Sequence, residues 1–172
     1  MVELVVFDWN STLLADAQSC VDAGNYTIEK YGGKSRSRQW IIEEFSFPTR
    51  NFYHKAGCDW DTLGESEHSE VFHEFYEKRS SKCRTRKGTR EILNWLEENS
   101  VDTMILSNCV ETIIYDQLER LKIKDKFTHV SGNDDCGGAA AGLNKIERMK
   151  KYFEDTHINP KLAVMVGDAP ED

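Results

Sequence analysis

The sequence predicts an α/β protein with a parallel sheet, interrupted after its first strand by a helical insertion. Four short apolar runs of strand length occur along the 172 residues. Helical periodicity fills the intervals between the later runs, and strands alternating with helices imply parallel pairing through right-handed crossovers. No convincing strand pattern occurs between the first run and the second. The four runs are residues 4–7, 103–106, 127–131 and 162–166.

The first run, Leu-Val-Val-Phe, has the size and β-branched content of a strand buried on both faces. Asp8 follows it directly. A buried strand cannot hold a bare carboxylate in its middle, because desolvating that charge costs several kcal/mol. Asp8 therefore belongs at the carboxyl end of the strand, where open α/β sheets place their ligand crevices.

Residues 15–86 have several helical patterns and are predicted to form a small inserted bundle, whereas residues 1–14 and 87–172 form the α/β core. Val71, Phe72, Phe75 and Tyr76 share one face of the last predicted helix of the bundle. His68 and His73 are five apart, a spacing that suits no helical metal pair, so both are interpreted as surface or edge residues. The predicted helices of the insertion are residues 17–31, 39–45, 48–57 and 66–80.

Three helices are expected in the core, at residues 88–98, 110–121 and 143–154. The segment from 110 to 121 has the clearest helical period and includes Gln117 on its apolar face. Residues 132–142, which contain glycines, are expected to form a loop. The residues predicted to face inward on the first and third of these helices are Ile92, Leu93, Trp95, Leu96, Leu143, Ile146, Met149, Tyr152 and Phe153.

Composition excludes several classes of protein. The net charge of −8 disfavours a general nucleic-acid binder. No apolar run approaches the ~20 residues needed to span a bilayer, and the N-terminus has no basic flank, so neither a membrane span nor a signal peptide is expected. The five cysteines are scattered and form no Cys-x-x-Cys pair, which favours free thiols in the cytoplasm over disulfides or zinc. Cys109 is interpreted as a small buried residue, with a reactive thiol beside a helix start as the alternative.

Reactive groups follow three of the predicted strands: Asp8 with Asn10, Ser107 with Asn108, and Asp168 with Asp172. Because the carboxyl ends of parallel strands share one edge, these groups are expected to converge on one crevice. Lys145, at the start of a predicted helix that enters from that edge, can reach the same place.

These residue types suit phosphoryl chemistry. Asp8 can attack phosphorus as a nucleophile. Asp8 and Asp168 supply carboxylates for Mg²⁺, with Asp172 completing the site or orienting a bound water. Ser107 and the N–H groups before the helix that starts near Val110 form an anion cradle. Lys145 would neutralise the repulsion between Asp8 and the phosphate. The residues assigned to phosphate binding are Ser11, Thr12, Ser107, Asn108 and Lys145.

Each feature also has a purely structural interpretation. Asp8 and Asn10 could start a turn, and Ser107-Asn108 with Glu111 could cap a helix. Lys145 could be a solvated lysine like Lys150, and Asp168 could belong to a turn that starts a helix. For Asp8 and Asn10 alone, the two interpretations weigh about equally, and for each of the other features taken singly the structural interpretation is the better one. The order of the motifs, each beside a strand end or a helix start, favours the functional interpretation.

The motifs together resemble those of the haloacid dehalogenase-like hydrolases, in the phosphoglycolate phosphatase-like branch. Residues 7–13 look like motif one, residues 105–108 resemble motif two, Lys145 fits motif three, and residues 167–172 match motif four. The resemblance implies a Rossmann-like core, Mg²⁺ held partly through the Asn10 position, and a helical cap that closes over a small phosphorylated substrate. It also implies a further strand after Asp172, so the C-terminal strand is expected to be missing from this sequence.

Two residues depart from the family pattern. Asn10 stands where family phosphatases have the Asp that acts as general acid and base. An amide cannot exchange a proton in that way, and loss of such help typically costs about 10²–10⁴-fold in rate. The second departure is Ser11, where glycine is usual.

The leading hypothesis is a magnesium-dependent phosphatase of small metabolites, slowed by Asn10. The alternative is a non-catalytic phosphate-ligand binder or interaction protein descended from such a phosphatase. The dehalogenase relatives, which need no metal, are disfavoured by Asp168 and Asp172. The motifs name neither the substrate nor the oligomeric state.

Overall fold

A computed structural model of the chain describes residues 1–59, 65–141 and 145–169. The chain divides into two compact units, each described separately below. The α/β unit comprises Met1–Ala15, Arg84–Asn133 and Asn144–Asp172. The helical unit comprises Asp16–Cys83 and Asp134–Leu143.

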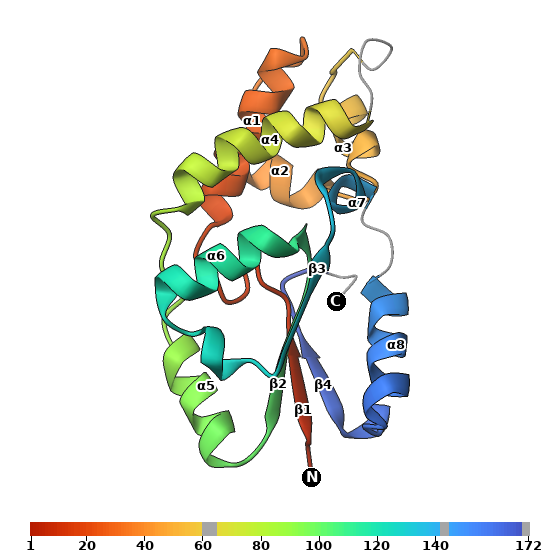
Figure 1. Ribbon diagram of the computed structural model, residues 1–172. Helices are drawn as coiled ribbons and strands as arrows, with labels where there is room; N and C mark the ends of the chain where they lie inside the picture. The colour runs from red at the N-terminus through yellow and green to blue at the C-terminus, as the bar shows by residue number, and fades with distance from the viewer. Residues whose placement is uncertain (60–64, 142–144, 170–172) are drawn as a thin grey trace. The chain divides into compact units, whose positions relative to one another are not determined.

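The α/β unit is built on a parallel sheet with the strand order β3-β2-β1-β4 (Figure 1). Phe7 pairs with Ile105 on one side and with Val166 on the other, so β1 and β4 end level with Ile105, and β2 continues to Val110. The predicted α/β class is therefore confirmed. The strands are β1 (Leu4–Phe7), β2 (Asp102–Val110), β3 (His129–Asn133) and β4 (Ala163–Val166).

Helices cover both faces of this sheet (Figure 1). On one face, α8 (Lys145–Thr156) packs Met149, Tyr152 and Phe153 against Leu4, Val6, Met104 and Leu106. The other face is covered by α5 (Thr89–Glu98) and α6 (Glu111–Leu121), whose inward residues are the buried Leu93, Leu96, Ile114 and Leu118. The 3₁₀ turns η1 (Lys124–Lys126) and η2 (Pro160–Leu162) precede β3 and β4.

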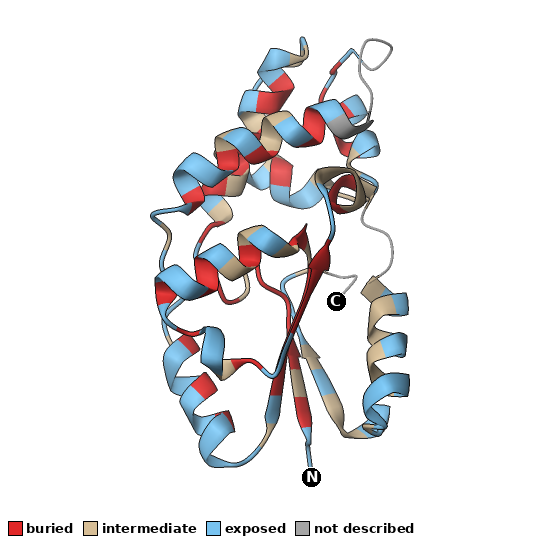
Figure 2. Ribbon diagram, viewed as in Figure 1, coloured by how far each residue is buried: buried red, intermediate tan, exposed pale blue. Residues whose placement is uncertain are grey.

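Three residues predicted to face inward are instead exposed. Ile92 is 41% exposed and Trp95 is 54% exposed on α5, and Ile146 is 69% exposed on α8. Much of the ribbon of α5 is coloured as exposed in Figure 2. The buried stripe of α5 consists of Thr89, Leu93 and Leu96. A helix of ten residues buries only a narrow stripe, so an apolar residue one position away from it points to solvent.

Gly132 lets the end of β3 approach the first turn of α6. A Cβ atom there would lie 2.6 Å from Glu111 Cα and 2.7 Å from Glu111 N, both backbone atoms. The Gly132 N–H also donates to Glu111 Oε2 at 3.1 Å. Only glycine fits this approach, which holds the edge strand against the helix that follows β2.

The helical unit contains α1 (Ala17–Lys30), α2 (Arg38–Glu44), α3 (Thr49–Lys55), α4 (Glu65–Ser80) and α7 (Cys136–Ala141). Its main core is formed by Val21, Ile28, Ile41, Phe52, Tyr53, Ala56 and Cys58. The helix α1 also packs along α4.

The segment that forms α7 was predicted to be a loop of the core, but it is a helix that packs against α4. Ser69 Oγ on α4 donates to the Cys136 carbonyl at 2.6 Å, and Ala139 and Ala140 are buried. The sequence Cys-Gly-Gly-Ala-Ala-Ala has no large apolar residue and therefore shows no helical period. The observed helical unit thus includes Asp134–Leu143, which the predicted boundaries assigned to the α/β core.

The two histidines of α4 were predicted to lie at the surface, and this was wrong. His68 is 1% exposed and His73 is 8% exposed. His68 Nε2 lies 3.1 Å from Thr49 Oγ1 and its ring packs edge-on against Tyr53. The His73 ring lies edge-on to the rings of Phe72 and Tyr76, which stack on one another. Spacing along one helix says nothing of the aromatic neighbours that tertiary packing brings to these rings.

All five cysteines are free thiols, and Cys58 and Cys109 are buried. Burial raises the pKa of the Cys58 thiol, although nearby Arg36 acts in the opposite direction. Within the described part of the chain, no helix is both long and apolar enough to cross a membrane.

Candidate active site

Asp8 lies at the carboxyl end of β1, as predicted. Its N–H donates to the Val166 carbonyl at 2.9 Å, which extends the pairing of β1 with β4 by one residue. The Asp8 side chain is only 10% exposed, and Oδ1 lies 3.0 Å from Lys145 Nζ. A carboxylate so deeply buried needs a partner, and the ammonium group of Lys145 provides one.

Lys145 is the first residue of α8, and its side chain is 13% exposed. The interpretation of Lys145 as one more solvated lysine is therefore wrong. Lys150 and Lys151 on the same helix are exposed. The difference follows from helix geometry, because the first turn of α8 is the part nearest the carboxyl edge of the sheet.

The loop after β1 folds back on itself. The N–H groups of Leu13 and Leu14 both donate to the Trp9 carbonyl, at 3.1 and 3.0 Å. Ser11 has a φ of 59°, a left-handed conformation that glycine adopts without cost. Ser11 thus adopts a left-handed backbone conformation at a position where the resemblance leads us to expect glycine.

Trp9 fixes this loop to the α/β core. The indole is wholly buried, and its Nε1 donates to Gln117 Oε1 on α6 at 2.5 Å. Gln117 was placed on the inward face of its helix from periodicity alone, and it is 4% exposed. The contact joins the segment that carries Asp8 and Asn10 to the helix that follows β2.

The end of β2 brings Ser107 to the same edge. Ser107 is 1% exposed, and its hydroxyl accepts a hydrogen bond from the Cys109 N–H at 3.2 Å. The same oxygen lies 3.5 Å from Asn10 Oδ1, at the outer limit of a hydrogen bond. Asn10 and Ser107, which are 97 residues apart in sequence, therefore face one another.

Ser107 and Asn108 do not cap α6. The residue that precedes the helix is Val110, and no side chain caps its first turn. Glu111 instead accepts from the Gly132 N–H of β3. The Asn108 carbonyl accepts from Asn133 Nδ2 at 2.8 Å, and the side-chain Oδ1 of Asn108 is buried with no hydrogen-bond partner among the described residues. The capping interpretation is therefore wrong.

Asp168 follows β4 and meets the loop after β1. Thr12 Oγ1 donates to Asp168 Oδ1 at 3.3 Å. Asp172, predicted as a further metal residue, lies outside the described residues. The described ranges contain no group of three or more His, Cys, Asp or Glu residues that could hold a metal ion. Asp8 and Asp168 nevertheless lie after adjacent strands, and two carboxylates are enough protein ligands for Mg²⁺ when a phosphate supplies others.

Arg148 is a residue of this edge that the sequence analysis missed. It lies one turn after Lys145 on α8 and donates to groups at the ends of β2 and β3. No sequence motif indicates Arg148, because its hydrogen-bond partners are mostly backbone carbonyls.

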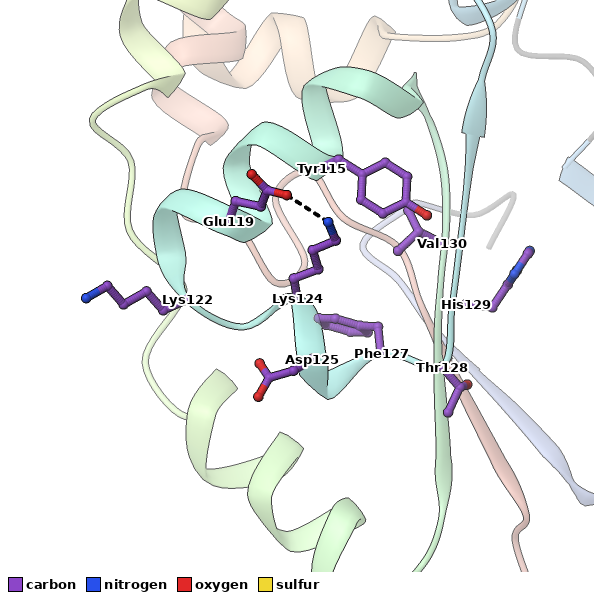
Figure 3. A pocket seen from close by; sticks show the side chains of 9 residues that line it. All are labelled: Tyr115, Glu119, Lys122, Lys124, Asp125, Phe127, Thr128, His129 and Val130. Carbon is purple, nitrogen blue, oxygen red and sulfur yellow. Dashed lines mark hydrogen bonds and ion pairs between the residues drawn. The ribbon is translucent and has the colours of Figure 1, made fainter.

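A hollow of about 740 Å³ lies elsewhere on the α/β unit (Figure 3). It is lined by α6, η1 and the amino end of β3, where Tyr115, Phe127 and His129 are found. Its best-placed charges already pair, since Lys124 Nζ lies 2.7 Å from Glu119 Oε1. This pairing raises the pKa of Lys124 and lowers that of Glu119. The hollow lies at the opposite end of β3 from the predicted site and holds none of the predicted residues.

The fold and this edge of the sheet define a class of hydrolase. A family model described as haloacid dehalogenase-like hydrolase matches residues 5–172, and the chain belongs to that family. The resemblance drawn from the motifs is thereby confirmed.

Among curated proteins, the chain is 25% identical to phosphoglycolate phosphatase 1 of Pseudomonas aeruginosa, over 98% of this chain and 63% of that protein. It is 22% identical to a putative pyrophosphatase PpaX of Caldanaerobacter subterraneus, over 99% of this chain and 75% of that protein. The chain therefore spans less than two thirds of the length of the first of these relatives.

Solved structures share the fold. A haloacid dehalogenase-like family protein from Streptococcus pneumoniae superposes with a TM-score of 0.78 at 17% identity, covering 98% of this chain and 77% of that one. A predicted phosphatase from Clostridium acetobutylicum has a TM-score of 0.76 at 16% identity, covering 98% and 76%. An Asp-to-Asn variant of CbbY from Rhodobacter sphaeroides, in complex with xylulose-(1,5)bisphosphate, has a TM-score of 0.72 at 13% identity, covering 98% and 79%.

Proposed function

We propose that this protein hydrolyses small phosphate monoesters through a phosphoenzyme formed on Asp8. The observation that supports this most directly is the buried contact of 3.0 Å between Asp8 Oδ1 and Lys145 Nζ at the carboxyl edge of a parallel sheet. A nucleophilic carboxylate must approach an anionic phosphoryl group, and a fixed ammonium beside it lowers the repulsion between them. Membership of the haloacid dehalogenase-like family and the similarity to phosphoglycolate phosphatase 1 agree with this reaction.

In the first step, an oxygen of Asp8 forms a bond to phosphorus while the bond from phosphorus to the ester oxygen breaks. The departing oxygen takes a proton from solvent water and leaves as the alcohol. In the second step, water attacks the aspartyl phosphate, which releases inorganic phosphate and restores the Asp8 carboxylate. We assign Lys145, the Ser107 hydroxyl and Asn108 to binding of the phosphoryl oxygens.

The donor set at this edge suits Mg²⁺. Asp8 and Asp168 are hard oxygen ligands after adjacent strands, and Mg²⁺ is commonly held by one or two carboxylates plus substrate phosphate and water. When bound, the ion would neutralise charge on the transferring phosphoryl group. The backbone carbonyl of Asn10 and the carboxylate of Asp172 are the further ligands that the family resemblance implies.

Asn10 determines the expected rate. Its amide lies near Ser107 but can neither give a proton to the departing oxygen nor remove one from water. We infer a slow phosphatase that favours esters with good leaving groups and stays longer as the phosphoenzyme. The Asp-to-Asn variant of CbbY in complex with a sugar bisphosphate supports small phosphorylated molecules as the ligand class.

The helical unit is proposed to act as the cap over the substrate, because it is inserted after β1, where the resemblance places such a cap. Five free thiols agree with a reducing compartment such as the cytoplasm.

The test is release of phosphate from p-nitrophenyl phosphate, a substrate whose leaving group needs no proton. We expect turnover that requires Mg²⁺, is lost with a chelator and is abolished in Asp8→Asn. Lys151→Met, which removes an exposed lysine of α8, is the matched control and should keep the wild-type rate. Turnover that survives Asp8→Asn would exclude the proposed nucleophile. Phosphate binding without turnover in the wild type would instead support the non-catalytic binder.

A further inference from the structure

Arg148 joins the carboxyl ends of two strands of the α/β unit. Its Nη2 donates to the Ser107 carbonyl of β2 at 2.9 Å. Its Nη1 donates to the Gly132 carbonyl of β3 at 2.7 Å and to Ser131 Oγ at 3.1 Å. A planar guanidinium with several donors in fixed directions suits such a bridge, and a lysine does not.

The bridged part of β2 is irregular. The register between β2 and β3 shifts between Leu106 and Val110, so the residues between them leave the regular ladder. A strand end that has left its ladder needs other partners for its carbonyl groups. Arg148 supplies the partner at Ser107, and Asn133 Nδ2 supplies the partner at Asn108.

Holding the Ser107 carbonyl also orients the next peptide N–H. The peptide unit between Ser107 and Asn108 is planar and trans, so its N–H points away from its C=O. A guanidinium bound to the carbonyl therefore also fixes the direction of the Asn108 N–H, which lies in the same plane and points the opposite way. The same contact limits the position of the Ser107 hydroxyl, which is 1% exposed and faces Asn10.

Arg148 also fixes the first turn of α8. Residues three apart lie on the same side of a helix, so the side that meets the strand ends through Arg148 is the side from which Lys145 reaches Asp8. The contacts of Arg148 thus link Ser107 and Lys145, two groups that the sequence places on different elements.

We propose that Arg148 is a positioning residue of the phosphate site, which acts through the Ser107 carbonyl and the first turn of α8. This inference rests on the proposed function, since it assigns Arg148 to the same site. Arg148 would set the geometry of Ser107, Asn108 and Lys145 without itself touching the substrate.

The test compares Arg148→Met and Arg148→Lys with the control Lys151→Met, in the full chain. The readouts are affinity for tungstate, an analogue of phosphate, measured by calorimetry with Mg²⁺ present, and kcat and KM with p-nitrophenyl phosphate. We expect Arg148→Met to bind tungstate about tenfold or more weakly. This factor corresponds to the loss of about one charge-assisted hydrogen bond to the ligand from the groups that Arg148 positions. Arg148→Lys keeps the charge without the fork and should remain weaker than the wild type, whereas Lys151→Met should match it.

Two further measurements distinguish a positioning role of Arg148 from a purely structural one. Leu93→Ala lowers the stability of the same unit from α5, away from the strand ends, and should keep the tungstate affinity at temperatures where it is folded. Added methylguanidinium should partly restore tungstate binding to Arg148→Ala and should not change Lys151→Met.

The inference is overturned if the wild type binds tungstate and the folded Arg148 variants bind it equally well, or if Leu93→Ala loses as much affinity as Arg148→Met. If Arg148→Met does not fold, the tungstate affinity of Arg148→Lys tests the inference instead, because lysine keeps a positive charge at this position of α8. Failure of the wild type to bind tungstate at all would reject the proposed function, and the inference with it.

Discussion

Lys145 Nζ lies 3.0 Å from Asp8 Oδ1, and the two side chains are 13% and 10% exposed. The contact joins the first residue of α8 to the residue that follows β1, across 137 positions of the sequence. A buried ion pair of this kind stabilises the fold only while both partners are present, because a single buried charge without its partner is costly.

A double-mutant cycle measures this coupling. Lys145→Met and Asp8→Asn should each lower the free energy of unfolding, and the double variant should lose less than the sum of the two by about 1–3 kcal/mol. Urea unfolding followed by circular dichroism gives the four values. Strict additivity would contradict the close contact.

Restoring a carboxylate at position 10 should accelerate turnover. Asn10→Asp is expected to raise kcat on alkyl phosphate esters about 10²–10⁴-fold, because those leaving groups need a proton. The gain should be smaller with p-nitrophenyl phosphate. Asn10→Ala, which removes the amide that faces Ser107, serves as the control and should not accelerate the reaction. Unchanged or lower activity in Asn10→Asp would reject the assigned role.

The Trp9–Gln117 hydrogen bond should contribute to stability as a buried polar pair. Gln117→Leu leaves the indole N–H of Trp9 without this acceptor and is expected to cost about 1–3 kcal/mol. In a Trp9→Phe background, which has no such N–H, the same substitution should cost less. Equal losses in the two backgrounds, measured by urea unfolding, would show that the hydrogen bond contributes little.

His73 should make the helical unit sensitive to acid. Burial lowers the pKa of its imidazole from 6.5 to about 4, and its Nδ1 is buried without a hydrogen-bond partner among the described residues. In the unfolded chain His73 takes up a proton near pH 6.5, the ordinary pKa of an imidazole, whereas in the folded chain it does so only near its lowered pKa. The folded state therefore has its full stability above the unfolded-state pKa of His73, and it loses stability as the pH falls from that value toward the folded-state pKa.

From pH 7 to pH 5 this residue should cost the wild type about 2 kcal/mol of unfolding free energy, a loss that His73→Phe removes. His54→Gln, which changes an exposed histidine of the same unit, should keep the wild-type pH dependence. A pH profile of His73→Phe that superposes on that of the wild type would contradict the low pKa. Urea unfolding at each pH supplies the measurement.

The parts of the site that could be predicted are those that local sequence patterns indicate. Asp8 follows an apolar run that reads as a buried strand, and its observed strand, Leu4–Phe7, has the predicted bounds. Ser107 and Asp168 lie at the ends of similar runs, and Lys145 begins a periodic helix. The parallel sheet then brought these ends to one edge, as the topology requires.

The errors occurred where partners come from distant segments. The helix α7 has no apolar period, and it became visible only through its packing on α4. His68 and His73 are buried by aromatic rings of their own unit, and Ile146 is exposed although it fits a helical stripe.

By itself, the sequence determined the α/β class and the candidate residues Asp8, Ser107, Lys145 and Asp168, because short-range hydrophobic patterning decides where strands and helices begin and end. The tertiary structure alone decided which charges pair, which histidines are buried, and that Arg148 holds two strand ends together. These depend on contacts between backbone carbonyls and side chains far apart in the chain, and such contacts leave no periodic signal in the sequence.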